Sequence, residues 1–266
     1  MVYVPPASPD CLTAYLATTF TDDELKAFKS AFELGACSKF NPMLEIKIVH
    51  APDDYLGKSH QYMRAKENEA GNEGPFLVID DEAKERGAAW YVSTFASDEE
   101  VEDEEAESTD AVWKILIKTE ALALAHVNYD IANMSIGEDL DNAGVELPLT
   151  NDFHQPELND CGGIDFYEEQ SRQDTWVTAE PGEFEESTDP ENLNNFMPRP
   201  DKVARLKEEV ARSVGIVPRW AIPSEAGPVE NDDGTQIEFP EGSVVLQQAY
   251  NPDHPWPEAS WPEGSL

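Results

Sequence analysis

The chain has 266 residues, with 55 Asp and Glu against 18 Lys and Arg, and a formal net charge of -37. A surface of this sign repels nucleic-acid phosphate and anionic lipid, so we expect neither nucleic acid nor membrane as a partner. Apolar residues make up 40% of the chain and aromatic residues 9%, which excludes a disordered acidic tail and predicts a folded chain with a large core.

Targeting segments and cysteine spacing point to an ordinary intracellular protein. The sequence has no run of about 20 apolar residues, the length that a membrane span requires. Its first residues lack the basic and apolar segments of a secretory signal, so we expect a soluble protein in the cytoplasm or nucleus. The cysteines, Cys11, Cys37 and Cys161, are widely spaced without a C-x-x-C pair, which argues against a disulfide framework or a structural zinc site.

The first half of the chain alternates helical and strand patterns. A capping box at Thr21 to Glu24, followed by apolar residues at helical spacing, predicts a helix over 22–34 that Gly35 ends. A polar helix is expected over 59–69, a short helix over 119–125 and a strand over 127–136. Alternating or continuous apolar residues predict four further strands, over 44–50, 76–79, 88–95 and 111–117.

A run of acidic residues separates the last two of these strands. From Asp98 to Asp110 nine residues are Asp or Glu and none is basic. We expect a β-hairpin whose long tip, residues 97–110, is a solvated loop, because dense like charges resist compaction. The side chains that we expect to contact a basic partner are Asp98, Glu99, Glu100, Glu102, Asp103, Glu104, Glu105 and Glu107.

Beyond residue 136 the periodic patterns fade. Between Lys118 and Arg199 there are nineteen acids and one base, so the charge excess is regional rather than spread over the whole surface. One helix is expected over 201–214, and a turn at Asn231 to Gly234 precedes strands over 236–239 and 243–248.

These elements predict an α+β fold with a mixed or antiparallel sheet, flanking helices and a long irregular C-terminal half. We expect two parts. The first is a core over 1–136 that carries the acidic hairpin loop, and the second is an acidic, loop-rich extension over 137–266 packed on that core.

The acidic composition also suggests weak binding of divalent cations. Asp139 and Asp141 occupy ligand positions of an EF-hand loop, with Glu146 nearby, but Ala143 and Thr150 replace two required ligands. Low-affinity calcium binding and a solvated turn are both open interpretations here. A second candidate is the densest group of metal-capable side chains around a histidine, although its spacing matches no zinc or iron pattern. This group is His154, Asp152, Glu157 and Asp160.

Catalytic fingerprints are missing from the sequence, which has no nucleophile elbow, phosphate-binding loop or dinucleotide motif. His60 and Tyr62 lie in the one locally basic segment, which we interpret as a polar helix face. The regional acidity favours an interaction protein that engages a basic partner through acidic patches. The alternative is an enzyme that acts on a small molecule in a pocket lined by aromatic residues of 153–196.

Overall fold

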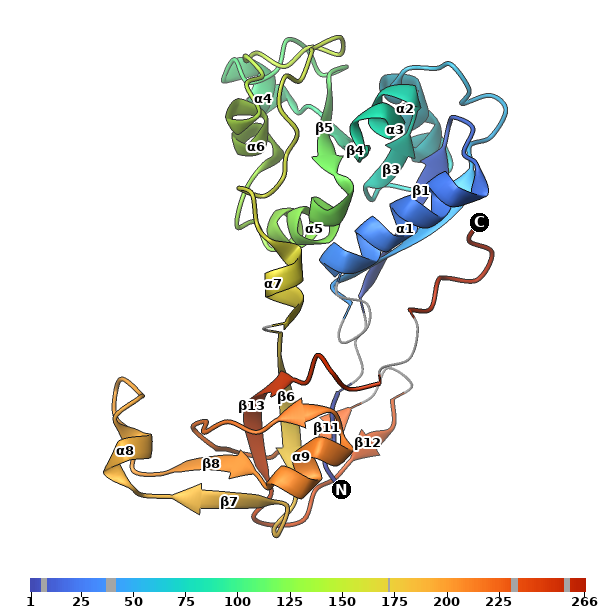
Figure 1. The fold of residues 1–266 in the computed structure, drawn as a ribbon. Helices are drawn as coiled ribbons and strands as arrows, with labels where there is room; N and C mark the ends of the chain where they lie inside the picture. The colour runs from blue at the N-terminus through green and yellow to red at the C-terminus, as the bar shows by residue number, and fades with distance from the viewer. Residues whose placement is uncertain (6–8, 37–41, 172, 231–233, 256–258) are drawn as a thin grey trace. The chain divides into compact units, whose positions relative to one another are not determined.

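The computed structural model describes residues 1–5, 9–36, 42–171, 173–230, 234–255 and 259–266. The chain forms two compact units (Figure 1). The larger unit comprises Ser8–Phe166 with Glu258–Leu266, and the smaller unit comprises Met1–Ala7 with Tyr167–Pro257. Sequence patterns placed a division after residue 136, whereas the contacts place it after Phe166. The predicted α+β class is confirmed.

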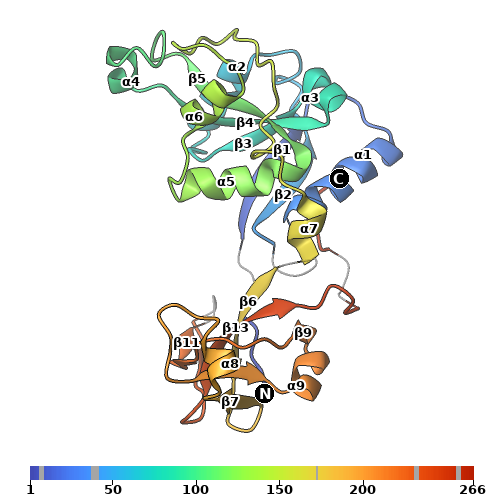
Figure 2. The same cartoon turned by 60° about the vertical axis from the view of Figure 1, so that its left-hand side comes forward.

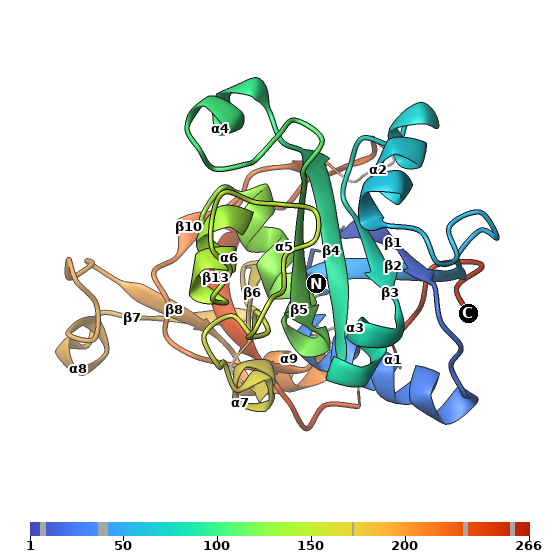
Figure 3. The same cartoon turned by 90° about the horizontal axis from the view of Figure 1, so that it is seen from above.

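A five-stranded mixed sheet forms the centre of the larger unit, in the order β2-β1-β3-β4-β5. Its strands are β1 (Asp10–Leu16), β2 (Leu44–His50), β3 (Phe76–Ile79), β4 (Ala88–Phe95) and β5 (Val112–Lys118). β1 runs parallel to β2 and β3, whereas β4 is antiparallel to β3 and β5. Figure 3 shows β3, β4 and β5 side by side. The hairpin predicted from the two strands around the acidic run therefore forms.

Helices cover both faces of this sheet (Figures 1 and 2). The helices of this unit are α1 (Asp22–Ala36), α2 (His60–Glu69), α3 (Asp81–Arg86), α4 (Asp98–Glu102), the 3-10 turn η1 (Thr119–Ala121), α5 (Leu122–Asp130) and α6 (Ile136–Asn142). Of these, α4 lies in the connection between β4 and β5 and buries no residue. The Trp90 ring of β4 lies 5.2 Å from His60 of α2, whereas Tyr91 contacts His126 of α5. Because successive residues of a strand point to opposite faces, α2 and α5 cover opposite faces of the sheet. α1 packs beside α5.

The start of α1 follows the sequence prediction and its end does not. The capping box forms, since the Glu24 N–H donates to Thr21 Oγ1 at 3.3 Å and the Thr21 N–H donates to Glu24 Oε2 at 2.8 Å. Gly35 does not end the helix, which continues to Ala36. A Cβ at Gly35 would lie 1.6 Å from the carbonyl oxygen of Glu120. The glycine therefore allows close packing of α1 on η1.

Two predicted elements differ in type from the structure. Residues 127–130 belong to α5 rather than to a strand. The predicted helix over 201–214 is instead strand β8 (Val203–Leu206) followed by α9 (Glu208–Ser213). Val203 and Leu206 are buried and fit a spacing of three residues, so helical periodicity alone did not distinguish the strand from a helix.

The smaller unit is built mainly from short strands. Its main sheet contains β6 (Asp174–Ala179), β9 (Ile216–Val217), β10 (Ser224–Glu225) and β13 (Val244–Tyr250). The remaining elements are β7 (Phe184–Ser187) paired with β8, β11 (Val229–Glu230) paired with β12 (Gln236–Ile237), α7 (Phe166–Ser171) at the unit boundary, and α8 (Pro190–Leu193).

The strand predicted over 243–248 becomes β13, which pairs with β6. The strand predicted over 236–239 becomes β12, which pairs with β11. Positions 231–233 of the predicted turn lie outside the described residues. Across all the described ranges, no helix has the length and apolar character needed to cross a membrane.

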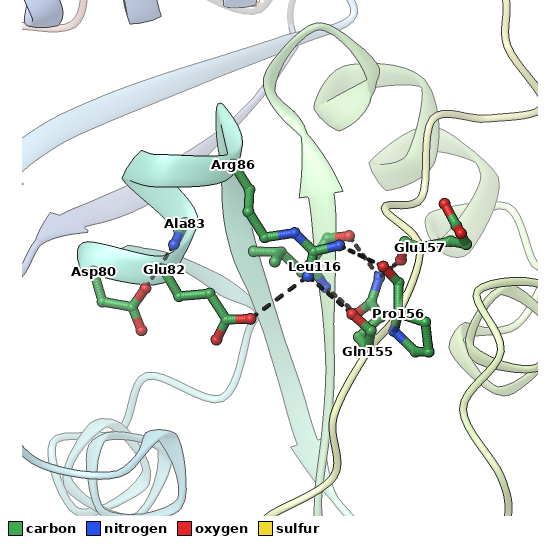
Figure 4. A network of polar contacts seen from close by, with 8 residues as sticks. All are labelled: Asp80, Glu82, Ala83, Arg86, Leu116, Gln155, Pro156 and Glu157. Atoms are coloured by element: carbon green, nitrogen blue, oxygen red, sulfur yellow. Dashed lines mark hydrogen bonds and ion pairs between the residues drawn. The ribbon is translucent and has the colours of Figure 1, made fainter.

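At the outer edge of β5, the Gln155 side chain makes the two backbone hydrogen bonds that a neighbouring strand would make (Figure 4). The Leu116 N–H donates to Gln155 Oε1 at 2.7 Å, and Gln155 Nε2 donates to the Leu116 carbonyl oxygen at 2.9 Å. Arg86 fixes the covering segment by donating to the carbonyl oxygens of Gln155 and Pro156, each at 2.9 Å. Covered edges prevent pairing with strands of other chains.

The opposite edge, at β2, is covered by the last residues of the larger unit. The Leu266 N–H donates to the Ile48 carbonyl oxygen at 2.9 Å, and the Ile48 N–H donates to Ser265 Oγ at 3.1 Å. Trp261 anchors this segment by donating from Nε1 to Glu33 Oε1 at 2.8 Å. Both edges of the five-stranded sheet are thus in contact with non-strand chain.

Candidate functional site

The acidic run between β4 and β5 is an ordered structure, which we call the acidic arm (residues 97–110). The sequence predicted a solvated loop, but the arm contains α4, whose capping box joins Ser97 and Glu100. The Glu100 N–H donates to Ser97 Oγ at 3.2 Å, and the Ser97 N–H donates to Glu100 Oε2 at 2.6 Å. A Ser-x-x-Glu pattern of this kind favours a helix start in spite of the dense negative charge.

The far side of the acidic arm is fixed to the chain near residue 149. The side chain of Ala106 is buried. On either side of it, the Glu107 N–H donates to the Leu149 carbonyl oxygen at 3.0 Å, and the Leu149 N–H donates to the Glu105 carbonyl oxygen at 2.8 Å. The carboxylates of the arm therefore project from a backbone that is held at both ends.

A second capping box orders the start of α6. The Glu138 N–H donates to Ser135 Oγ at 3.1 Å, and the Ser135 N–H donates to Glu138 Oε2 at 2.7 Å. The hydrogen bond from the Ser135 backbone lowers the pKa of Glu138 below its usual range. Glu138 therefore stays ionised at neutral pH and is held in one orientation.

The acidic arm and α6 line a common cavity of about 470 Å³, which we call the acidic cavity. Four carboxylates lie on its lining, from Glu100, Glu105, Glu138 and Asp141, together with the indole of Trp113. Among the described residues that line it, none is Lys or Arg. Carboxylates beside an aromatic ring form a suitable environment for a cation, which is attracted by both the negative charge and the ring face.

Only part of the predicted partner-binding set lies at this cavity. Glu100 and Glu105 line it, whereas the other predicted side chains are exposed on the arm outside the lining. These others are Asp98, Glu99, Glu102, Asp103, Glu104 and Glu107. The sequence analysis missed Trp113, Glu138 and Asp141. The Ser-x-x-Glu pattern, which occurs at 97–100 and again at 135–138, could have predicted the starts of α4 and α6, the two helices that carry Glu100 and Glu138.

The predicted metal-binding group does not converge. Asp152, His154, Glu157 and Asp160 are all exposed, and Asp160 Oδ1 instead accepts from the N–H groups of residues 162 and 163 at 3.0 and 2.9 Å. Over the part of the chain that the structure describes, no three His, Cys, Asp or Glu side chains are grouped closely enough to share a metal ion.

The calcium-loop interpretation of Asp139 also changes. Asp139 is a buried residue of α6, and its Oδ2 accepts from the Tyr129 hydroxyl at 2.6 Å and from Asn159 Nδ2 at 2.7 Å. These bonds join α6 to α5 and to the segment along β5. Its carboxylate is thus a structural acceptor, and Asp141 faces the acidic cavity instead.

His60 lies on the buried face of α2, whereas Tyr62 and several other polar residues of the helix lie partly or fully exposed on its outer face. His60 is 8% exposed, its Nε2 lies 3.5 Å from Asp80 Oδ2, and burial lowers the pKa of the imidazole. Lys114 lies over the Trp90 ring at 5.2 Å, and burial lowers its pKa too. None of these residues lines the acidic cavity. Their contacts join α2 to β4 and β5. Arg64, on the same helix, is fully buried.

Neither protein-family models, curated protein sequences nor solved structures give a match to this chain.

Proposed function

We propose that this chain is an acidic interaction protein that binds a cationic segment of a partner protein in the acidic cavity. The observation that carries the proposal is the lining of that cavity, with four carboxylates beside Trp113 and no Lys or Arg among its described lining residues. We expect the interaction to take place in the cytoplasm or nucleus, and the partner to be a basic protein rather than a nucleic acid.

Two features of the cavity support tight binding of a lysine or arginine side chain. Glu100 and Glu138 are each fixed by a capping box, so less side-chain entropy is lost when a cation binds. The net charge of -37 raises the association rate of a basic partner, an effect that salt screens.

The enzyme alternative has no comparable support. The aromatic residues of 153–196 are divided between the two units, with Phe153 and Phe166 in the larger and Trp176 and Phe184 in the smaller. The acidic cavity contains none of them in its lining.

The test is titration of a fluorescent hexalysine peptide into the full chain at about 50 and about 300 mM salt. A peptide of six acetyl-lysines is the uncharged control. The test variant carries Glu100→Gln, Glu105→Gln and Glu138→Gln, because glutamine preserves the capping hydrogen bonds and removes only the charge. We expect its Kd for hexalysine to rise about tenfold or more.

A polycation also binds a strongly acidic protein without a specific site, so the control variant removes the same charge elsewhere. It carries Asp53→Asn, Glu73→Gln and Glu85→Gln, all exposed positions of the larger unit outside the acidic cavity. We expect this control to change the Kd by less than about threefold. If both variants raise the Kd for hexalysine equally, the peptide binds through the overall negative charge, and the proposed site is wrong.

A further inference from the structure

The outer edge of β2 carries backbone groups without a partner. Ile48 directs its N–H and its carbonyl oxygen away from β1, since both bond to residues 265–266. Ala51 instead donates to the carbonyl oxygen of Leu16 in β1 at 3.0 Å. Because the direction of the backbone groups alternates along a strand, Ile46 presents its N–H and carbonyl oxygen at the same outer edge as Ile48. Among the described residues, none bonds to either group of Ile46.

The segment that covers this edge, residues 259–266, leaves those groups buried and unpaired; we call it the strap. Ile46 is 0% exposed, so its two backbone groups are removed from water without gaining a partner, which costs free energy. None of the eight residues of the strap is itself buried. A cavity of about 40 Å³ also remains between the strap, β2 and α1. A strand that paired along β2 would make hydrogen bonds that the strap does not make.

The side chains of β2 are complementary in charge to those of a second, antiparallel β2. If Ile46 faces Ile46 of a second copy, Glu45 lies opposite Lys47 of that copy, and Lys47 lies opposite its Glu45. Both Glu–Lys pairs then occupy non-hydrogen-bonded positions, where opposite side chains are closest. Pairing centred on Leu44 or on Ile48 places neither charge opposite an ionisable residue. Charge complementarity therefore selects the register centred on Ile46.

These two side chains are available for such pairing. Glu45 and Lys47 are both partly exposed, and among the described residues neither has an ion-pair partner within 4.0 Å. In the same register the outward backbone groups of Leu44, Ile46 and Ile48 form hydrogen-bonded pairs with those of the second copy.

We propose that the strap is a displaceable cover and that, once it is released, two copies of this chain pair through their β2 edges. The two five-stranded sheets then join into one continuous sheet with two-fold symmetry. The main side-chain anchor of the strap is Trp261, whose ring lies 5.9 Å from that of Phe32 and whose Nε1 donates to Glu33 Oε1 at 2.8 Å. Removing this indole releases the edge without changing β2. The proposal is independent of the acidic cavity.

Sedimentation equilibrium of the full chain with Trp261→Ala tests the release of the edge. The measurement is made at about 300 mM salt, because the charge of -37 on each copy opposes association at low salt. We expect the Kd of the Trp261→Ala dimer to be about tenfold or more below that of the parent chain. The control is Trp176→Ala, which removes an exposed tryptophan of the smaller unit and should leave the Kd of the parent unchanged.

Equal Kd values for the parent chain and Trp261→Ala would overturn the proposal. A dimer formed by exchange of straps between two copies needs Trp261 in its groove, so Trp261→Ala would weaken that dimer. A higher Kd for Trp261→Ala than for the parent would therefore also overturn the proposal.

A dimer formed through the uncovered apolar groove would pass this first test, so the charge pairs are exchanged in the Trp261→Ala chain. Adding Glu45→Lys places lysines opposite each other, and adding Lys47→Glu instead places glutamates opposite each other. We expect either change to raise the Kd about tenfold or more, because like charges directly opposite destabilise a sheet. Glu45→Lys is the sharper test, since it reduces the net negative charge and general repulsion alone would predict a stronger dimer.

An equimolar mixture of the two charge variants places lysine opposite glutamate again. We expect the mixture to regain the Kd of the Trp261→Ala chain within about threefold, which also shows that both variants fold. Dimers that persist in each charge variant alone would overturn the proposal, and so would a mixture that stays monomeric.

Discussion

Replacing Gly35 by alanine tests how closely α1 packs on η1. In an ordinary helix interior, Gly to Ala stabilises a protein by about 1 kcal/mol, because alanine restricts the unfolded chain and favours the helix. At Gly35 the added Cβ would lie 1.6 Å from the Glu120 carbonyl oxygen, far below the 3.0 Å that real Cβ contacts respect. The obstacle is backbone on both sides, so no side-chain rotation relieves it.

The expected result is a loss of stability despite the better helix former. α1 must move away from η1 by more than an ångström, which also separates the buried Phe28 and Phe32 from their neighbours. Overpacking of this kind costs about 1–3 kcal/mol and occasionally more, so we expect a net loss of about 2 kcal/mol after the helix gain. Urea unfolding of the full chain, followed by circular dichroism, measures the change.

Gly137 is the matched control, since it is also a helical glycine. A Cβ there would lie 3.5 Å from the Trp113 ring, an ordinary van der Waals contact. Gly137→Ala should leave stability unchanged or raise it by up to about 1 kcal/mol. If Gly35→Ala is as stable as the parent chain, or if both variants behave alike, the close packing of α1 on Glu120 is not the reason for a glycine at position 35.

Two further predictions concern the sheet edge and the start of α1. Gln155→Ala should lower the free energy of unfolding by about 2–4 kcal/mol, measured in urea, because the buried Leu116 N–H loses its acceptor. Hydrogen exchange at the Leu116 amide should become faster, and unchanged exchange would contradict this role of Gln155. The hydrogen bond from the Thr21 backbone N–H, and after it the Lys84 ammonium, lower the pKa of the Glu24 carboxyl from its ordinary value of 4.5 to about 2. Its stabilising contribution should be complete above about pH 4.5 and be lost as the pH falls towards 2, which NMR titration of the carboxyl checks; a measured pKa near 4.5 would refute it.

Strands with continuous or strictly alternating apolar residues were the easiest elements to predict. β2, β3 and β4 have the predicted bounds, because a period of two residues over a buried sheet admits few other structures. Arg64 shows where such reasoning stops. Its position in a polar segment suggested a surface residue, yet its guanidinium is buried and donates to the carbonyl oxygens of Gly74, at 2.7 Å, and Ser93. Only the tertiary structure supplies those acceptors.

The candidate sites were less accessible to sequence reasoning than the strands. Charge density marked Glu100 and Glu105, but Trp113 and Glu138 reach the same cavity from a strand and a helix that follow later in the chain. Asp10, Tyr91 and His126 are likewise joined by hydrogen bonds although no local motif connects their positions in the chain. Besides charge density, the Ser-x-x-Glu capping pattern was the local sign of the acidic cavity, and it reports helix geometry rather than function.

The larger unit is discontinuous, since its final segment follows the whole of the smaller unit in the chain. A ribosome therefore makes the smaller unit before it makes Trp261, Ser265 and Leu266, the residues that cover β2. Until that moment the nascent larger unit exposes a strand edge able to pair with neighbouring chains on the same messenger. Slow translation of the smaller unit would lengthen the time during which this edge stays uncovered.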